Sequence, residues 1–103
     1  MGASMWQKVA KVSDFDVAGA QRVQTSSADI AVFKKGGRFY AISNICPHKG
    51  ASLVEGYVEG NVVTCPWHAW QFDISSGVCQ NVPAMTQKCF AVKIHEEDIL
   101  LDL

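Results

Sequence analysis

The sequence predicts an all-β fold. Apolar and polar residues alternate with a period of two over short segments, and glycine-containing turns separate these segments. Only Ser13–Val17 suggests a helical turn. The chain has 103 residues, 49% of them hydrophobic, which is enough for a modest core. We therefore expect a single domain over residues 1–103.

Two turn sequences predict β-hairpins. The first turn, a pair of glycines, joins a strand over Asp29–Lys35 to a strand over Arg38–Ser43. Such a pair accepts the positive φ angles of a tight two-residue turn. The second turn, Gly60-Asn61, joins Tyr57–Glu59 to Val62–Thr64 in the same way.

The remaining strands follow from the same pattern. A strand over Gln71–Ile74 ends at the turn Ser75-Ser76-Gly77. From Phe90 to Ile94 the apolar residues alternate with polar or small ones, which predicts that the apolar face points inward. Residues 96–98 form a turn into a last strand over Ile99–Leu103.

Charge and hydropathy exclude several functions. The net charge is -1, so no basic surface for nucleic acid or for a membrane is expected. No segment approaches the roughly 18 apolar residues of a membrane span. The first five residues show no charged region followed by an apolar one, so no secretory signal is expected. These features favour a cytoplasmic protein, in which cysteine thiols stay reduced.

Two short motifs carry the chemistry. They are Cys46-Pro47-His48 and Cys65-Pro66-Trp67-His68, and each follows a predicted strand. Each motif offers one thiolate and one imidazole, and each proline stiffens its loop. The hairpin at Gly60-Asn61 lies between them and can bring the two loops together. In a zinc finger, by contrast, two Cys come first and two His follow on a helix.

The two motifs resemble the signature of Rieske proteins at all four ligand positions. The resemblance implies a base of antiparallel strands, arranged as a β-sandwich, with a small inserted cluster-binding lobe at about residues 44–84. Pro83 matches the proline of a loop that covers the cluster in this family. It also implies one [2Fe–2S] cluster, with Cys46 and Cys65 on one iron and His48 and His68 on the other.

The ligand set also predicts the reduction potential. Two ferric ions, two sulfides and two thiolates sum to zero charge, whereas a four-thiolate cluster starts with two negative charges. Neutral imidazoles therefore make reduction easier. High-potential respiratory members have two further cysteines, here Ala51 and Trp67, and hydroxyl donors, here Trp70 and Phe72. Without those donors we expect a potential of roughly -150 mV, at the low end of the Rieske range.

The chain resembles the Rieske ferredoxins of multicomponent aromatic-ring dioxygenases. The resemblance implies an electron carrier and not an enzyme, because a Rieske oxygenase also needs a mononuclear iron held by two His and a carboxylate. Beyond the two motifs this sequence has only His95, which is expected to face solvent. The implied partners are an NAD(P)H-dependent flavoprotein ferredoxin reductase and a terminal oxygenase, and a monomer is expected.

Other interpretations stay open from the sequence. A similar pattern occurs in the small subunit of assimilatory NAD(P)H nitrite reductases. The same four ligands would also suit a zinc-stabilised binding module without a redox role. The four cysteines would even allow two disulfides. Cys79 and Cys89 have no histidine at the right spacing and are expected to be small buried residues.

Overall fold

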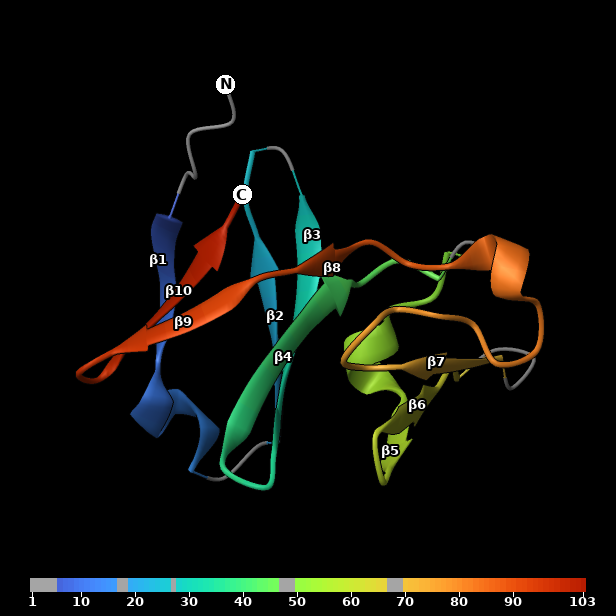
Figure 1. Cartoon of the computed structure of the whole chain (residues 1–103), viewed down its shortest axis with the longest axis horizontal. Coiled ribbons are helices and arrows are strands. Elements are labelled where there is room, and N and C mark those ends of the chain that lie inside the picture. Colours follow the sequence, from blue (N-terminus) through green and yellow to red (C-terminus); the bar gives the residue numbers. More distant parts are fainter. Residues whose placement is uncertain (1–5, 17–18, 27, 47–49, 67–69) are drawn as a thin grey trace.

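The computed structural model describes residues 6–16, 19–26, 28–46, 50–66 and 70–103. Over these residues the chain is almost entirely β-structure, as predicted (Figure 1). The short 3-10 helices are η1 (Val12–Phe15), η2 (Leu53–Glu55) and η3 (Pro83–Met85). The strands are β1 (Trp6–Lys11), β2 (Ala20–Gln24), β3 (Asp29–Lys35), β4 (Arg38–Ser43), β5 (Tyr57–Glu59), β6 (Val62–Thr64), β7 (Gln71–Asp73), β8 (Cys89–Phe90), β9 (Val92–His95) and β10 (Asp98–Asp102).

The strands form three antiparallel sheets. Two of them, β1-β10-β9 and β2-β3-β4-β8, make the base. The third, β5-β6-β7, belongs to the segment between β4 and β8, residues 44–88, which we call the lobe. Figure 1 shows the lobe beside the base, joined to it by the segments that follow β4 and precede β8. An inserted lobe is the arrangement that the resemblance implied.

Both predicted hairpins are present with the expected strand bounds. Gly36 and Gly37 have φ angles of 60° and 80°, which suit the turn between β3 and β4. Gly60 has φ 62° in the turn between β5 and β6. The short helix η1 overlaps the predicted helical turn at Ser13–Val17, of which the last residue lies outside the described residues.

Strand β3 belongs to two hydrophobic cores because its neighbouring side chains point to opposite faces. Ile30 and Val32 pack in the core of the base, with Phe90, Ile99 and Leu101 among others. Ala31 and Phe33 pack in a second core that extends into the lobe. All four are at most 1% exposed, so β3 is buried on both faces and joins the two regions.

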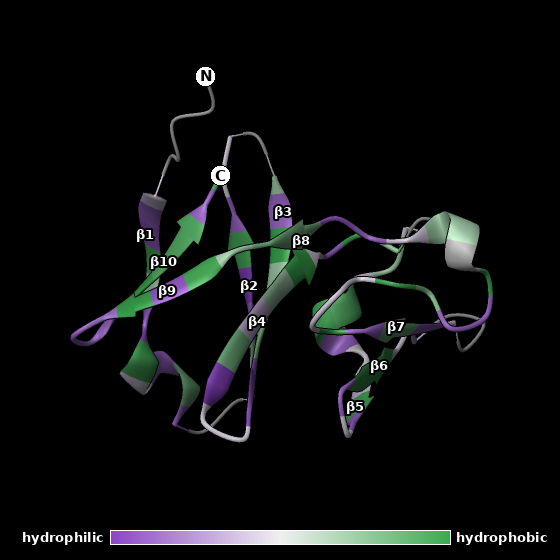
Figure 2. Ribbon diagram, in the orientation of Figure 1, coloured by the Kyte–Doolittle hydropathy of each residue, from purple (hydrophilic) through white to green (hydrophobic). Residues whose placement is uncertain are grey.

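The prediction for the segment from Phe90 to Ile94 was wrong in one respect. Phe90 is buried, but Ile94 is 45% exposed. The chain leaves the β2-β3-β4-β8 sheet after Phe90 and enters the other sheet as β9, which lies at its edge and has fewer neighbours to cover it. Hydrophobic and hydrophilic residues alternate along β9, the middle of β10 is hydrophobic, and the hairpin that joins the two strands is hydrophilic (Figure 2).

Three strand boundaries also differ by one residue from the prediction. Ile74 lies in the turn after β7, Asp98 is already part of β10, and Leu103 lies beyond its end. Strand β10 pairs with β1, so Trp6 lies opposite Asp102. No helix in the described ranges is long and apolar enough to cross a membrane.

Candidate metal centre

The two motif cysteines lie in the second core. Cys46 and Cys65 are 1% and 2% exposed, and both belong to the buried cluster that contains Leu53, Val63 and Phe72. Cys65 directly follows β6, and Cys46 follows β4 after two residues, so both occupy the strand-to-loop junctions that the sequence predicted. Neither cysteine forms a disulfide bond.

A backbone hydrogen bond closes each motif loop. In the first loop, Cys46 N donates to Ala51 O at 2.8 Å, and Gly50 N donates to Cys46 O at 2.8 Å. Gly50 has φ 76°, which favours glycine at this position. In the second loop, Cys65 N donates to Trp70 O at 2.7 Å. His48 and His68 lie between these closing bonds in sequence but outside the described residues.

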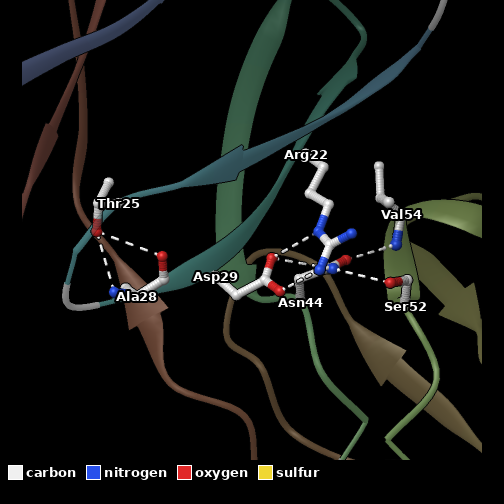
Figure 3. A network of polar contacts seen from close by, with 7 residues as sticks. All are labelled: Arg22, Thr25, Ala28, Asp29, Asn44, Ser52 and Val54. Atoms are coloured by element: carbon white, nitrogen blue, oxygen red, sulfur yellow. Dashed lines mark hydrogen bonds and ion pairs between the residues drawn. The ribbon is translucent and has the colours of Figure 1, made fainter.

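A buried asparagine anchors the first loop to the base. Asn44 is fully buried, and Figure 3 shows its amide between Asp29 and the lobe. The Asn44 Nδ2 donates to Asp29 Oδ1 and to Ser52 Oγ, both at 3.2 Å. The Asn44 Oδ1 accepts the Val54 N–H at 2.9 Å. Asn44 therefore ties the end of β4, β3 and the start of η2 together two residues before Cys46.

An ion pair supports this anchor from the side of β2. Arg22 Nε and Nη2 donate to the two carboxylate oxygens of Asp29, at 2.9 and 2.6 Å (Figure 3). Hydrogen bonding to Arg22 lowers the pKa of Asp29, and the Asn44 amide lowers it further. Asp29 therefore stays ionised and can accept bonds from both partners at once.

The loop after β7 folds back on itself, so that Gly77 lies against Gln87. Gly77 has φ 82°, and a Cβ there would lie only 2.1 Å from Gln87 O, so a larger residue does not fit. Before it, Asp73 Oδ1 accepts the backbone N–H of both Ser75 and Ser76. Hydrogen bonding from the Ser75 hydroxyl and then from the backbone lowers the pKa of Asp73. The backbone of Pro83 lies in η3, and its contacts are not among those described.

The two cysteines outside the motifs differ from each other. Cys79 is fully buried, as predicted, and its Sγ accepts the Val82 N–H at 3.4 Å. Cys89 is exposed, so the prediction of a buried residue was wrong. It lies in the two-residue edge strand β8, where its Sγ donates to Ser75 O at 3.2 Å. Partial desolvation raises the pKa of the Cys89 thiol. His95 is exposed, as predicted.

Sequence reasoning missed two residues that shape the first loop, Asn44 and Gln87. Both are polar side chains that the structure buries, at 0% and 7% exposure. Their bonding partners lie up to 44 residues away in the chain, so no local pattern marks them. A polar residue just before a metal-ligand motif was the only available signal, and it is weak.

The donors that the structure describes fit an iron–sulfur cluster. Two buried cysteines that form no disulfide lie in apolar surroundings and offer soft sulfur ligands. Within the described ranges no three His, Cys, Asp or Glu side chains form a group that would hold a metal ion. The imidazoles needed to complete a site with Cys46 and Cys65 belong to the residues outside those ranges.

The fold and the two buried motif cysteines together are those of a small β-protein suited to a metal centre. The profile of the Rieske [2Fe-2S] domain family matches residues 5–96. The chain belongs to this family, and its cofactor is one Rieske-type [2Fe–2S] cluster.

Similar proteins indicate which kind of Rieske protein this chain is. The chain is 41% identical over 95 residues to the 3-phenylpropionate/cinnamic acid dioxygenase ferredoxin subunit of Escherichia coli, covering 89% of this chain and 88% of that one. It is similar to a chain of the solved complex of reduced oxygenase and oxidized ferredoxin in carbazole 1,9a-dioxygenase, with TM-score 0.85, 31% identity, and coverage of 97% and 94%. These relatives are electron-transfer components, and so is this chain.

A third similarity concerns the fold alone. The putative NADH-dependent nitrite reductase small subunit from Mycobacterium tuberculosis superposes with TM-score 0.87, covering 97% of this chain and 96% of that one. The sequences are only 18% identical. The nitrite reductase alternative is therefore weaker than the ferredoxin interpretation.

Proposed function

We propose that this protein carries single electrons from an NAD(P)H-dependent flavoprotein reductase to the terminal oxygenase of an aromatic-ring dioxygenase system. The observation that carries the proposal is the similarity to dioxygenase ferredoxins over about nine tenths of both chains. Residues 1–103 would act as one domain and as a monomer in the cytoplasm.

The proposed ligands are the four motif residues. Cys46 and Cys65 would hold one iron as thiolates, and His48 and His68 would hold the other through ring nitrogens. The cluster supplies reversible exchange of one electron. The buried core around the two cysteines keeps water from their sulfurs, and the closed loops limit their movement. A site that moves little on reduction exchanges electrons faster.

Reconstitution tests the electron-carrier role. The protein is mixed with NADH or NADPH, a dioxygenase ferredoxin reductase and the matching oxygenase, and product is measured with and without it. Product formation that depends on this protein supports the proposal. Bleaching of its visible absorption by the reductase, with no product from any oxygenase tried, would contradict the proposed acceptor.

Spectroscopy tests the ligands separately. The dithionite-reduced protein should give the electron paramagnetic resonance signal of a Rieske centre, and His48→Ala and His68→Ala should each abolish it. A colourless protein that contains zinc would instead support the zinc-stabilised module. Gel filtration checks the expected monomer.

An exposed isoleucine next to the site allows a test of docking. Ile45, directly before Cys46, is 40% exposed. If the oxygenase docks at the motif loops, Ile45→Ser should raise the ferredoxin concentration needed for half-maximal turnover and leave the reduction potential unchanged. Ile94 on β9 of the base has a similar exposure of 45%, so Ile94→Ser is the matched control. Equal effects of the two substitutions would contradict docking at the lobe.

A further inference from the structure

Gln87 is a buried glutamine whose amide holds the chain next to Cys46. The side chain comes from the end of the loop that follows β7, and the residue is 7% exposed. Its Nε2 donates to Ser43 O at 3.0 Å and to Ile45 O at 2.6 Å. A primary amide has two N–H donors, so one side chain satisfies both carbonyls.

The Gln87 side chain donates hydrogen bonds just beyond the point where the backbone pairing between β4 and β8 ends. The ladder between β4 and β8 ends with a bond from Ser43 N to Lys88 O at 2.9 Å. One residue earlier the backbone has turned away, because Gln87 N donates to Gly77 O at 2.7 Å. The carbonyls of Ser43 and Ile45, at the end of β4 and just beyond it, would then lack a backbone donor. The Gln87 amide donates to both of them instead.

The opposite edge of the same segment is held by other bonds. Although the chain bends at Asn44, the backbone groups of Ser43 and Asn44 bond to opposite sides of the segment. On the second side, Asn44 N donates to Asp29 O at 2.8 Å and Asn44 O accepts from Leu53 N at 2.7 Å. The bonds of Cys46 to Ala51 and Gly50 continue that side. On the side that faces β8, the Gln87 amide is therefore the donor that holds the segment beyond the Ser43 N–H.

We propose that Gln87 is a positioning residue for the [2Fe–2S] cluster. By fixing Ser43 and Ile45, its amide holds the backbone that carries the Cys46 sulfur and couples the loop after β7 to that ligand. The inference depends on the proposed assignment of Cys46 as a ligand. Without the amide, two carbonyls next to the site lose their donor and the segment opens more easily.

The central variant is Gln87→Met, which keeps the length of the side chain but removes both donors. Leaving buried carbonyls without partners costs about 1–3 kcal/mol, so opening of residues 43–46 should increase about 5- to 150-fold. Hydrogen exchange followed by mass spectrometry measures this opening on the peptide that contains Cys46. Release of iron to a chelator should accelerate, and the electron paramagnetic resonance signal of the reduced cluster should broaden.

Two controls separate positioning from general destabilisation. Gln21 is a half-buried glutamine on β2 whose Nε2 donates to Asp14 O at 3.0 Å in an exposed bond, so Gln21→Met removes a similar bond far from the lobe. Ile99 is fully buried in the core of the base, and Ile99→Val increases the unfolded fraction about 2- to 13-fold by removing a buried methylene. Neither control should broaden the signal or speed exchange at Cys46 more than exchange elsewhere.

The outcomes are distinct. Broadening and local opening in Gln87→Met alone support the proposal, whereas an unchanged signal and unchanged exchange at residues 43–46 overturn it. If Gln87→Met does not fold, Gln87→Asn replaces it, since its amide is one methylene too short to reach both carbonyls. Local opening in that variant supports the proposal, and wild-type exchange overturns it. A wild-type protein without a Rieske signal would refute the proposed function instead, because the exchange experiment does not depend on the cluster.

Discussion

Replacing Asn44 by alanine should destabilise the protein strongly. The side chain is fully buried and makes three hydrogen bonds, to Asp29, Ser52 and the backbone N–H of Val54. The substitution leaves the Val54 N–H without an acceptor, which costs about 1–3 kcal/mol, and removes a bond to a charged carboxylate, which contributes about 1.5–3 kcal/mol. We expect a total loss of about 3 kcal/mol.

For a chain of this length, 1 kcal/mol corresponds to about 4–8 °C in the melting temperature. The Asn44→Ala protein should therefore melt roughly 12–24 °C below the wild type. Circular dichroism measures the loss of β-structure, and visible absorption measures loss of the cluster in the same sample. Because unfolding releases the cluster, the wild type and the Asn44→Ala protein must be compared at the same heating rate.

Asn81 provides the matched control. Its Oδ1 accepts the Gln71 N–H at 2.8 Å, the same type of bond that Asn44 makes with Val54, but at an exposed position. Water can replace the lost acceptor there, so Asn81→Ala should lower the melting temperature by only a few degrees, corresponding to about 0.5 kcal/mol. Equal shifts for the two variants, or a shift below about 4 °C for Asn44→Ala, would refute the argument from burial.

The lowered pKa of Asp29 means that its ionised form stabilises the fold fully above about pH 4 and that this contribution is lost as the pH falls through the folded-state pKa. Urea unfolding of Asp29→Asn should therefore show a deficit at neutral pH that shrinks in acid, and a deficit independent of pH would contradict this. Gly77→Ala should lower the unfolding free energy by at least about 2 kcal/mol, because residue 77 has a positive φ and its Cβ would lie 2.1 Å from a backbone carbonyl oxygen. Gly60→Ala is the control: φ is also positive there, but the space around the Cβ is open, so the loss in the same assay should be only about 1 kcal/mol. Cys65→Ser should abolish the visible absorption of the cluster while Cys89→Ser, at an exposed thiol, leaves it intact, and loss of colour in both would refute the ligand assignment. Voltammetry should give a potential of roughly -150 mV, and a value above zero would contradict the argument from missing hydroxyl donors.

Features encoded by neighbouring residues could be predicted from the sequence. The β3–β4 hairpin was placed correctly because two adjacent glycines permit only a few turns and fix the register of both strands. The positions of Cys46 and Cys65 after strands followed from the same local logic. These features need no knowledge of distant contacts.

Features that depend on distant partners could not be predicted. The exposure of Ile94 depends on which sheet receives β9, and the exposure of Cys89 depends on the position of β8 at the edge of its sheet. The burial of Asn44 and Gln87 reflects acceptors and donors on other strands. Phe72 could be predicted only in part. The motifs place it where high-potential members have a hydroxyl donor, but its burial together with both motif cysteines depends on distant contacts.

The pairing of Trp6 with Asp102 has a practical consequence for attaching this protein to other molecules. It brings the start of β1 and the end of β10 together on the base (Figure 1), whereas Cys46 and Cys65 belong to the lobe. A tether joined to the chain at this edge of the base, for example to an electrode or a fluorescent reporter, would leave the lobe with the proposed ligands uncovered. Immobilised molecules would then present the lobe in a uniform orientation to a partner in solution.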